Sequence, residues 1–208
     1  MRADLKIIAG QVQPEWRVLD LGCGSGELLA HLKATKRVNG YGLDFDADNI
    51  GACIRAGVNV LEQDLNEGLA NFEDDSFDLV VMTETIQAVA DPVLMLQEML
   101  RIASNCIVTF PNFGYWRCRA HLALRGRMPM AKHLPNDWHD TPNIHLCTFR
   151  DFEALCEDHR LPIAERFVVD ADYHASPLMQ WLPNLFGLTA YYRLTRDSHG
   201  RDAGTDRV

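Results

Sequence analysis

The chain has 208 residues, of which 47% are hydrophobic and 24% are charged, and its formal net charge is −9 at pH 7. This composition is typical of a globular domain with a sizeable core, and no apolar run approaches the roughly 18 residues that span a bilayer. A negative chain also argues against general binding to nucleic acid, whose phosphates need basic neutralisation. The six cysteines are scattered without a CxxC pair, which favours free thiols over a disulfide framework or a zinc site.

The first 110 residues alternate segments that are typical of strands and of helices. The expected helices cover 3–12, 26–35, 49–57 and 92–103, and the expected strands cover 17–22, 40–45, 58–64, 77–82 and 105–110. The strands are short and almost wholly apolar, as in a sheet that is covered on both faces. Asp46 and Asp48 can cap the third helix, Gly57 closes it, and Pro92 suits the start of the fourth. This alternation predicts an α/β fold with a mostly parallel sheet and helices on both faces.

The second half of the chain is less regular. Residues 112–147 are rich in Arg, His, Asn, Pro and Trp and contain no clear strand. The elements expected beyond them are a helix over 149–159 capped by Thr148, strands over 163–170 and 188–195, and an irregular connection through Pro177 and Pro183. We predict a single domain over residues 1–195 with seven strands, followed by a disordered polar tail over 196–208. The N-terminus carries Asp4 and no small-residue cleavage site, so we expect a cytoplasmic protein rather than an exported one.

The segment VLDLGCGSGELL, Val18 to Leu29, places three glycines between an expected strand and an expected helix. Such a turn brings backbone N–H groups and the positive end of a helix to the carboxyl edge of a parallel sheet. The segment lacks the lysine of a phosphate-cradling loop, and Glu27 stands where a dinucleotide fingerprint has its third glycine. The acids around the loop would repel a pyrophosphate, and they favour a ligand with an ammonium, a sulfonium and a ribose diol. S-adenosylmethionine is such a ligand.

Four segments in order resemble the class I S-adenosylmethionine-dependent methyltransferases: VLDLGCGSGELL, GYGLDFD, LEQDLNEGL and DDSFDLVVMTETIQAV. The resemblance implies a single-domain Rossmann-like fold. It places Asp44 on the ribose hydroxyls, Asp64 on the adenine amino group and Leu65 beside the ring. The residues that it implies for binding S-adenosylmethionine or S-adenosylhomocysteine are Asp20, Gly22, Cys23, Gly24, Gly26, Asp44, Phe45, Asp64, Leu65 and Thr83.

Each of these residues also has a purely structural interpretation. The glycines could serve only to permit a tight turn, and Asp44 and Asp64 could be a helix cap and a turn residue. Glu27 either contacts the ligand or complements the positive end of its helix, and Cys23 is expected to be packed without a reactive role.

Two later blocks, IVTFPNFGYWRCRAHLALRGRMP and LPNDWHDTPNIHLCTFRDFEALC, resemble the methionine-biosynthesis protein W (MetW) family. That family is associated with homoserine O-acyltransferase, and no methyl acceptor is established for it. The resemblance implies an S-adenosylmethionine-binding partner or activator of an acetyl- or succinyl-transferring enzyme. The signature [DNS]-P-P-[YF] of amino-methylating enzymes is missing after the fourth strand, where MTETIQ stands. An active methyltransferase on a small or protein substrate is the alternative.

Residues 113–133 contain five basic side chains and no acid. One interpretation is a solvated helix face with Trp116 in the core, and the other is an interface patch of arginines and aromatic rings. A nucleic-acid patch is disfavoured, because an acidic block lies elsewhere in the chain: Glu62, Asp64, Glu67, Glu73, Asp74, Asp75 and Asp78.

The segment WHDTPNIHLC gathers residues that could do chemistry. A His–Asp pair suits general-base work, and His139, His145 and Cys147 are possible metal ligands. Neighbouring His139 and Asp140 point differently in most backbones, however, and Pro142 bends the segment. We therefore expect a lid or a partner-facing loop, and we assign neither a catalytic residue nor a metal.

Overall fold

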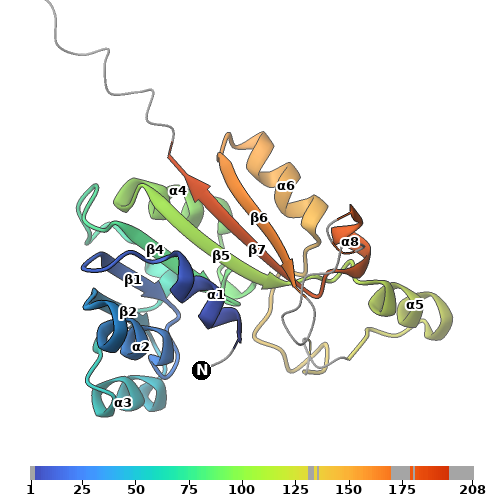
Figure 1. Ribbon diagram of the computed structural model, residues 1–208. Coiled ribbons are helices and arrows are strands. Elements are labelled where there is room, and N and C mark those ends of the chain that lie inside the picture. Colours follow the sequence, from blue (N-terminus) through green and yellow to red (C-terminus); the bar gives the residue numbers. More distant parts are fainter. Residues whose placement is uncertain (1–2, 131–133, 135, 170–178, 180, 197–208) are drawn as a thin grey trace, which may run out of the picture.

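The structure is a computed structural model, and it describes residues 3–130, 134, 136–169, 179 and 181–196. Within these residues the strands form one seven-stranded sheet in the order β3-β2-β1-β4-β5-β7-β6 (Figure 1). All pairs are parallel except those of β7, which runs antiparallel to β5 and to β6. The mostly parallel α/β fold expected from the sequence is confirmed. The polar tail expected over 196–208 lies, beyond Arg196, outside the described residues.

The strands are β1 (Arg17–Leu21), β2 (Asn39–Asp44), β3 (Asn59–Glu62), β4 (Leu79–Thr83), β5 (Asn105–Pro111), β6 (Ile163–Val169) and β7 (Thr189–Thr195). The α-helices are α1 (Ala3–Gln11), α2 (Glu27–Lys36), α3 (Ala47–Arg55), α4 (Pro92–Ile102), α5 (Trp116–Arg125), α6 (Phe149–Asp158) and α8 (Pro183–Phe186). Two short 3-10 helices, η1 (Leu65–Glu67) and η2 (Ile86–Ala88), follow the ends of β3 and β4. No helix in the described part of the chain is long and apolar enough to cross a membrane.

Helices cover both faces of the sheet, as predicted. On one face, α1, α2 and α3 pack in a cluster with strand residues such as Val18 and Val81. On the other face, α4 and α6 pack with residues such as Leu19, Met82 and Tyr192. Successive strand side chains point to opposite faces, so each apolar strand supplies both clusters at once. The continuous apolar runs of the sequence therefore reflect a doubly covered sheet.

Local signals set most element boundaries. Asp46 caps α3 by accepting hydrogen bonds from the backbone N–H of Asp48 and Asn49, so Asp48 is in the first turn and is not itself the cap. Thr148 and Asp151 form a reciprocal capping box at the start of α6. The connection expected to be irregular contains the short helix α8, which begins at Pro183 because proline favours the first helical position.

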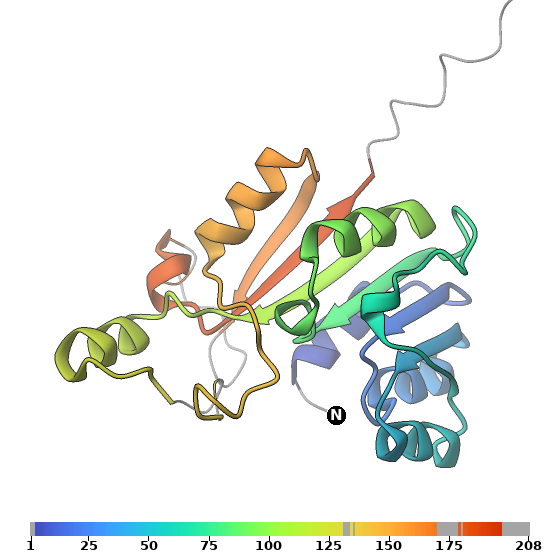
Figure 2. The ribbon, with the colours of Figure 1, turned by 180° about the vertical axis from the view of Figure 1, so that it is seen from behind.

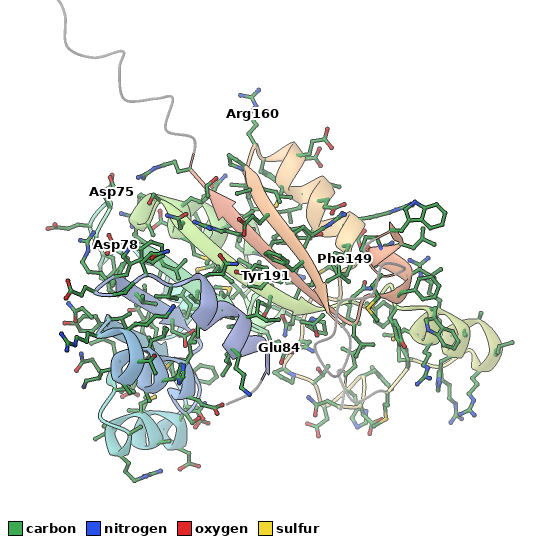
Figure 3. The ribbon with its side chains drawn as sticks, viewed as in Figure 1. Asp75, Asp78, Glu84, Phe149, Arg160 and Tyr191 are labelled. Atoms are coloured by element: carbon green, nitrogen blue, oxygen red, sulfur yellow. The ribbon has the colours of Figure 1, made fainter. Side chains whose placement is uncertain are left out.

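The acidic side chains of the turn before β4 form ion pairs with arginines. Asp78 pairs with Arg17 at 3.0 Å, and Asp74 pairs with Arg101 at 2.7 Å. Asp75 pairs with Arg196. Figure 3 shows Asp75 and Asp78 at the opposite end of β4 from Glu84. These acids therefore lie at the amino edge of the sheet, away from the edge where the glycine turn is found.

Burial makes the fold sensitive to alkali. Burial raises the pKa of Cys106, Tyr191 and Tyr192 above their ordinary values, and it raises the pKa of Cys147 and of Cys156 to about 12. The unfolded chain loses these protons at a lower pH than the folded chain does. The free energy of unfolding therefore keeps its full value below pH 9 and falls as the pH rises beyond it. At pH 10 a buried thiol such as Cys106 should cost on the order of 1–2 kcal/mol of stability. Urea unfolding at pH 7, 9 and 10.5 should show a falling free energy of unfolding, and a constant value would contradict this burial.

Candidate functional site

The glycine turn joins β1 to α2 and is fastened to the next strand. The backbone N–H groups of Gly22 and Cys23 both donate to the carbonyl of Leu43, at 2.9 and 3.0 Å. Gly22, Gly24 and Gly26 all have positive φ, a region that side chains rarely adopt, so the three glycines are needed for this path. The turn thus lies directly against the carboxyl end of β2.

Asp44, the last residue of β2, organises this edge of the sheet. It is 7% exposed, and its Oδ2 accepts a hydrogen bond from the backbone N–H of Gly24 at 2.8 Å. Its Oδ1 accepts from the backbone N–H of Asp46 at 3.0 Å and from Asn49 Nδ2 at 3.3 Å. A carboxylate offers about four lone-pair sites, so Oδ2 keeps capacity for a hydroxyl donor. The side chain therefore fixes the turn and can also bind a ligand there.

Buried acids give this corner a negative character. Asp20, within β1, is 2% exposed, and Asp44 follows on the neighbouring strand. The Cys23 thiol packs beside Gly42 and lies 3.8 Å from Cys53 Sγ. Burial is the main cause of the raised pKa of Cys23, with Asp20, Cys53 and Asp44 adding to it. The thiol is thus neutral and inert, whereas the acids favour a ligand that carries positive charge.

The other expected ligand residues follow the next strands. Asp64 caps η1 after β3, and its Oδ1 accepts hydrogen bonds from the backbone and the side chain of Asn66. Leu65 is buried in the core cluster, and Phe45 is 71% exposed beside Asp44. Thr83 ends β4, and its carbonyl accepts a hydrogen bond from Thr85 Oγ1 at 2.9 Å.

The structure brings the expected cofactor-binding residues to one edge of the sheet. Those on or after β1, β2, β3 and β4 share the carboxyl edge because these strands are adjacent and parallel. The sequence did not predict that Thr85 would pack against Gly22 or that Asn49 would donate a hydrogen bond to Asp44. A Cβ on Gly22 would lie 2.6 Å from Thr85 Oγ1, so Thr85 closes the turn from the β4 side. Neither residue carries a local sequence signal for this contact.

The His-containing segment returns to the same edge. The backbone N–H groups of Ile144 and His145 both donate to the carbonyl of Gln87 at 2.9 Å, and His145 Nε2 lies 3.4 Å from the Ala90 carbonyl. The Phe113 N–H donates to the Cys147 carbonyl at 3.0 Å. Residues 144–147, called the closing segment here, therefore bridge η2 after β4 and the end of β5.

The side chains of this segment that could act as a general base or bind a metal do not converge on one site in the described part of the chain. His139 is exposed and meets Trp138 edge-on with ring centroids 5.5 Å apart. Among the described residues no cluster of three His, Cys, Asp or Glu side chains could hold a metal. The basic helix α5 lies apart from the candidate site, and Trp116 is 42% exposed, so it is not a core residue.

Gly24 offers a direct test of where a ligand approaches. Its φ is +54°, and a Cβ built there would meet nothing within 4 Å. We therefore expect Gly24→Ala to cost only about 1–2 kcal/mol of stability, from the backbone conformation, while the methyl group enters the space beside the turn. A bulkier Gly24→Val change would add strain. Calorimetry should show that Gly24→Ala weakens binding of S-adenosylhomocysteine, and unchanged affinity would place the ligand elsewhere.

A sheet of this order, with its one antiparallel strand between β5 and β6 and a glycine turn facing an acid on the next strand, defines the class I methyltransferase fold. Within that class, residues 2–194 match the family described as methionine biosynthesis protein MetW. The chain belongs to this family. The resemblance found in the sequence is thereby confirmed.

Two known proteins are similar to this chain in sequence, and a solved structure is similar to it in fold. The chain is 37% identical over 190 residues to a bifunctional methionine biosynthesis protein MetXA/MetW of Rhodopirellula baltica; the match covers 87% of this chain but 30% of that protein. It is 26% identical to a ubiquinone biosynthesis O-methyltransferase of Methylococcus capsulatus, over 60% of this chain and 54% of that one. A methyltransferase structure from Archaeoglobus fulgidus matches with a TM-score of 0.66 at 18% identity, covering 93% and 92% of the two chains, and shows the shared fold.

Proposed function

We propose that this chain binds S-adenosylmethionine at the carboxyl ends of β1, β2 and β3 and acts as a partner, and as an activator, of homoserine O-acyltransferase. The ligand contacts are those expected from the sequence, with Asp44 on the ribose and Asp64 on the adenine amino group. The paired burial of Asp20 and Asp44 supports a ligand with an ammonium and a sulfonium.

The observation that carries the proposal is the position of the closing segment. Methyl transfer is an in-line displacement, so an acceptor must reach the methyl group in a defined geometry. We take the acceptor to approach between the ends of β4 and β5, beside Thr83 at the end of β4. The backbone N–H groups of Ile144 and His145 donate hydrogen bonds across that approach to the carbonyl of Gln87. The carbonyl of Cys147 accepts a hydrogen bond from the backbone N–H of Phe113. A covered acceptor side favours ligand sensing over methyl transfer.

The partnership is supported by one relative. The Rhodopirellula baltica protein is named as bifunctional MetXA/MetW, so a MetW segment and a MetXA segment occur there in one chain. A covalent link holds two modules at high effective concentration, which is useful when they work together. S-adenosylmethionine is a downstream product of methionine synthesis, so a fold that binds it can report its level to an early acyltransferase. Such coupling requires that ligand affinity differ between the free and the bound chain.

The alternative function is methyl transfer to an unidentified small or protein substrate. It is favoured by the similarity to an O-methyltransferase of Methylococcus capsulatus. A shared fold does not fix the reaction, however, because function depends on the site. The two functions therefore need an experiment that scores both.

That experiment uses the homoserine acyltransferase of the organism from which this chain comes. Mixed with this chain, it should elute as a joint complex from a sizing column, and S-adenosylmethionine should change the fraction in the complex. The same mixture with S-adenosylmethionine labelled in its methyl group should leave both proteins and homoserine unlabelled. Separate elution at every ligand concentration would contradict the partnership, and labelled product would favour the methyltransferase.

A further inference from the structure

The connection between β5 and α6 forms an extension of the domain. The chain leaves β5 at Pro111, forms α5, and returns to Thr148 at the start of α6. Both ribbon views show α5 standing away from the sheet, beyond α8 (Figure 1, Figure 2). A connection this long inside a compact domain is usually functional. We call the described residues of 115–130 together with 134 and 136–138 the arm.

Large apolar side chains lie on the surface of the arm. Leu124 is 86% exposed, Trp138 is 74% exposed and Met130 is 55% exposed. Trp116, Leu122 and Met128 are also exposed. Single exposed apolar residues are common, but a group of six on one short extension is typical of an interaction site.

Two hollows lie beside three of these side chains, Met128, Met130 and Trp138. The larger, of about 790 Å³, lies between α5 and the chain that follows it. Its lining is apolar at Met128, Met130 and Trp138, and it also includes His121, Arg125, Arg127 and one acid, Asp137. The second shares Met128, Met130 and Trp138 and continues to Phe113 and Leu146. The apolar surface therefore runs from the arm to the closing segment beside the candidate ligand site.

The charge of the arm is opposite to that of the rest of the molecule. The described residues of the arm contain four arginines and one acid, Asp137, whereas the rest of the chain has 16 basic and 28 acidic side chains. The guanidinium of Arg117 lies over the Trp116 ring, 5.3 Å from its centroid. Among the described residues, Arg125 and Arg127 form no ion pair, so their charges are available to a partner.

We propose that the arm is the docking surface for the acyltransferase, which presents an acidic face with an apolar anchor that enters the hollow at Trp138. This inference rests on the function proposed above. Interface centres are enriched in Trp, Met and Arg, the residue types that gather here. A two-fold pairing of arms from two copies would oppose arginines to arginines, which disfavours self-association through this surface.

The test measures binding of the source organism's homoserine acyltransferase to the immobilised 208-residue chain. Trp138→Ala should weaken binding about 30-fold or more, mainly through faster dissociation, and Leu124→Asp should have an effect of similar size. The double change Arg125→Glu with Arg127→Glu should slow association at low salt, with a smaller effect at high salt. Ile54→Asp and Arg55→Glu on α3 are matched controls, because both side chains are exposed and α3 lies at the opposite end of the molecule from α5 (Figure 1).

The outcomes separate the docking surface from the proposed function. If wild-type chain does not bind the acyltransferase, the partnership and the docking surface both fail. If wild type binds and the arm variants bind equally well, the partnership stands and the arm is not the interface. Thermal unfolding should show wild-type stability for Trp138→Ala and Leu124→Asp, because both side chains are largely exposed. If sedimentation shows that the arm variants abolish self-association of the chain instead, the arm is a contact between copies and the proposal is overturned.

Discussion

Asp44→Ala should weaken binding of S-adenosylmethionine and of S-adenosylhomocysteine by about 1–3 kcal/mol, or roughly 5- to 150-fold in the dissociation constant. The change removes the acceptor of the expected ribose hydroxyls. It also removes the acceptor of the Gly24 and Asp46 N–H groups, which hold the turn against β2. Titration calorimetry on folded protein measures the effect, and binding that is as tight as in wild type would exclude Asp44 from the site.

A neighbouring carboxylate provides the control for this change. Asp46 also accepts backbone hydrogen bonds, from Asp48 at 2.9 Å and Asn49 at 3.0 Å, but it serves as the N-cap of α3. Asp46→Ala should cost about 1 kcal/mol of stability. Its ligand affinity should stay close to that of wild type. Equal losses of affinity in the two variants would mean that general loosening of this edge, rather than a ribose contact, explains the effect.

Gly22→Ala should destabilise the protein by about 2–5 kcal/mol, the sum of a positive-φ cost and an overpacking cost. The φ of Gly22 is +70°, and its new Cβ would lie 2.6 Å from Thr85 Oγ1 and 2.8 Å from Thr85 Cγ2. Urea unfolding measures the change. Adding Thr85→Ala should recover the overpacking part and leave the backbone part.

Gly57→Ala is the matched control for the backbone part alone. Gly57 has a φ of +68° at the end of α3, and a Cβ there would meet nothing within 4 Å. The loss of stability for Gly22→Ala should therefore exceed that for Gly57→Ala by about 1–3 kcal/mol. Equal losses would show that Thr85 does not close the turn.

The fold was predictable because its signals are local. Apolar strands, the cap at Asp46 and the Thr148 capping box act within a few residues, so the sequence shows them directly. The candidate site followed from the same logic, because ends of adjacent parallel strands must meet at one edge. The carboxylate of Asp44 and the N–H of Gly24 meet as that logic requires.

The features that escaped prediction depend on long-range contacts. The closing segment binds the carbonyl of Gln87 through the backbone N–H groups of Ile144 and His145, and backbone groups carry no residue-specific signal. Thr85 meets Gly22 only because β4 lies beside β1. Trp116 could be core or surface by its type alone, and its exposure reflects the projection of α5 away from the sheet.

The rate of homoserine acylation decides whether this chain activates the acyltransferase. The purified acyltransferase is assayed while this chain is added in increasing amounts, with and without S-adenosylmethionine. We expect a saturable rise in rate, a response to S-adenosylmethionine that Asp44→Ala weakens, and no methylated product. An acylation rate that stays constant at saturating amounts of the chain, at every ligand concentration, would contradict this expectation.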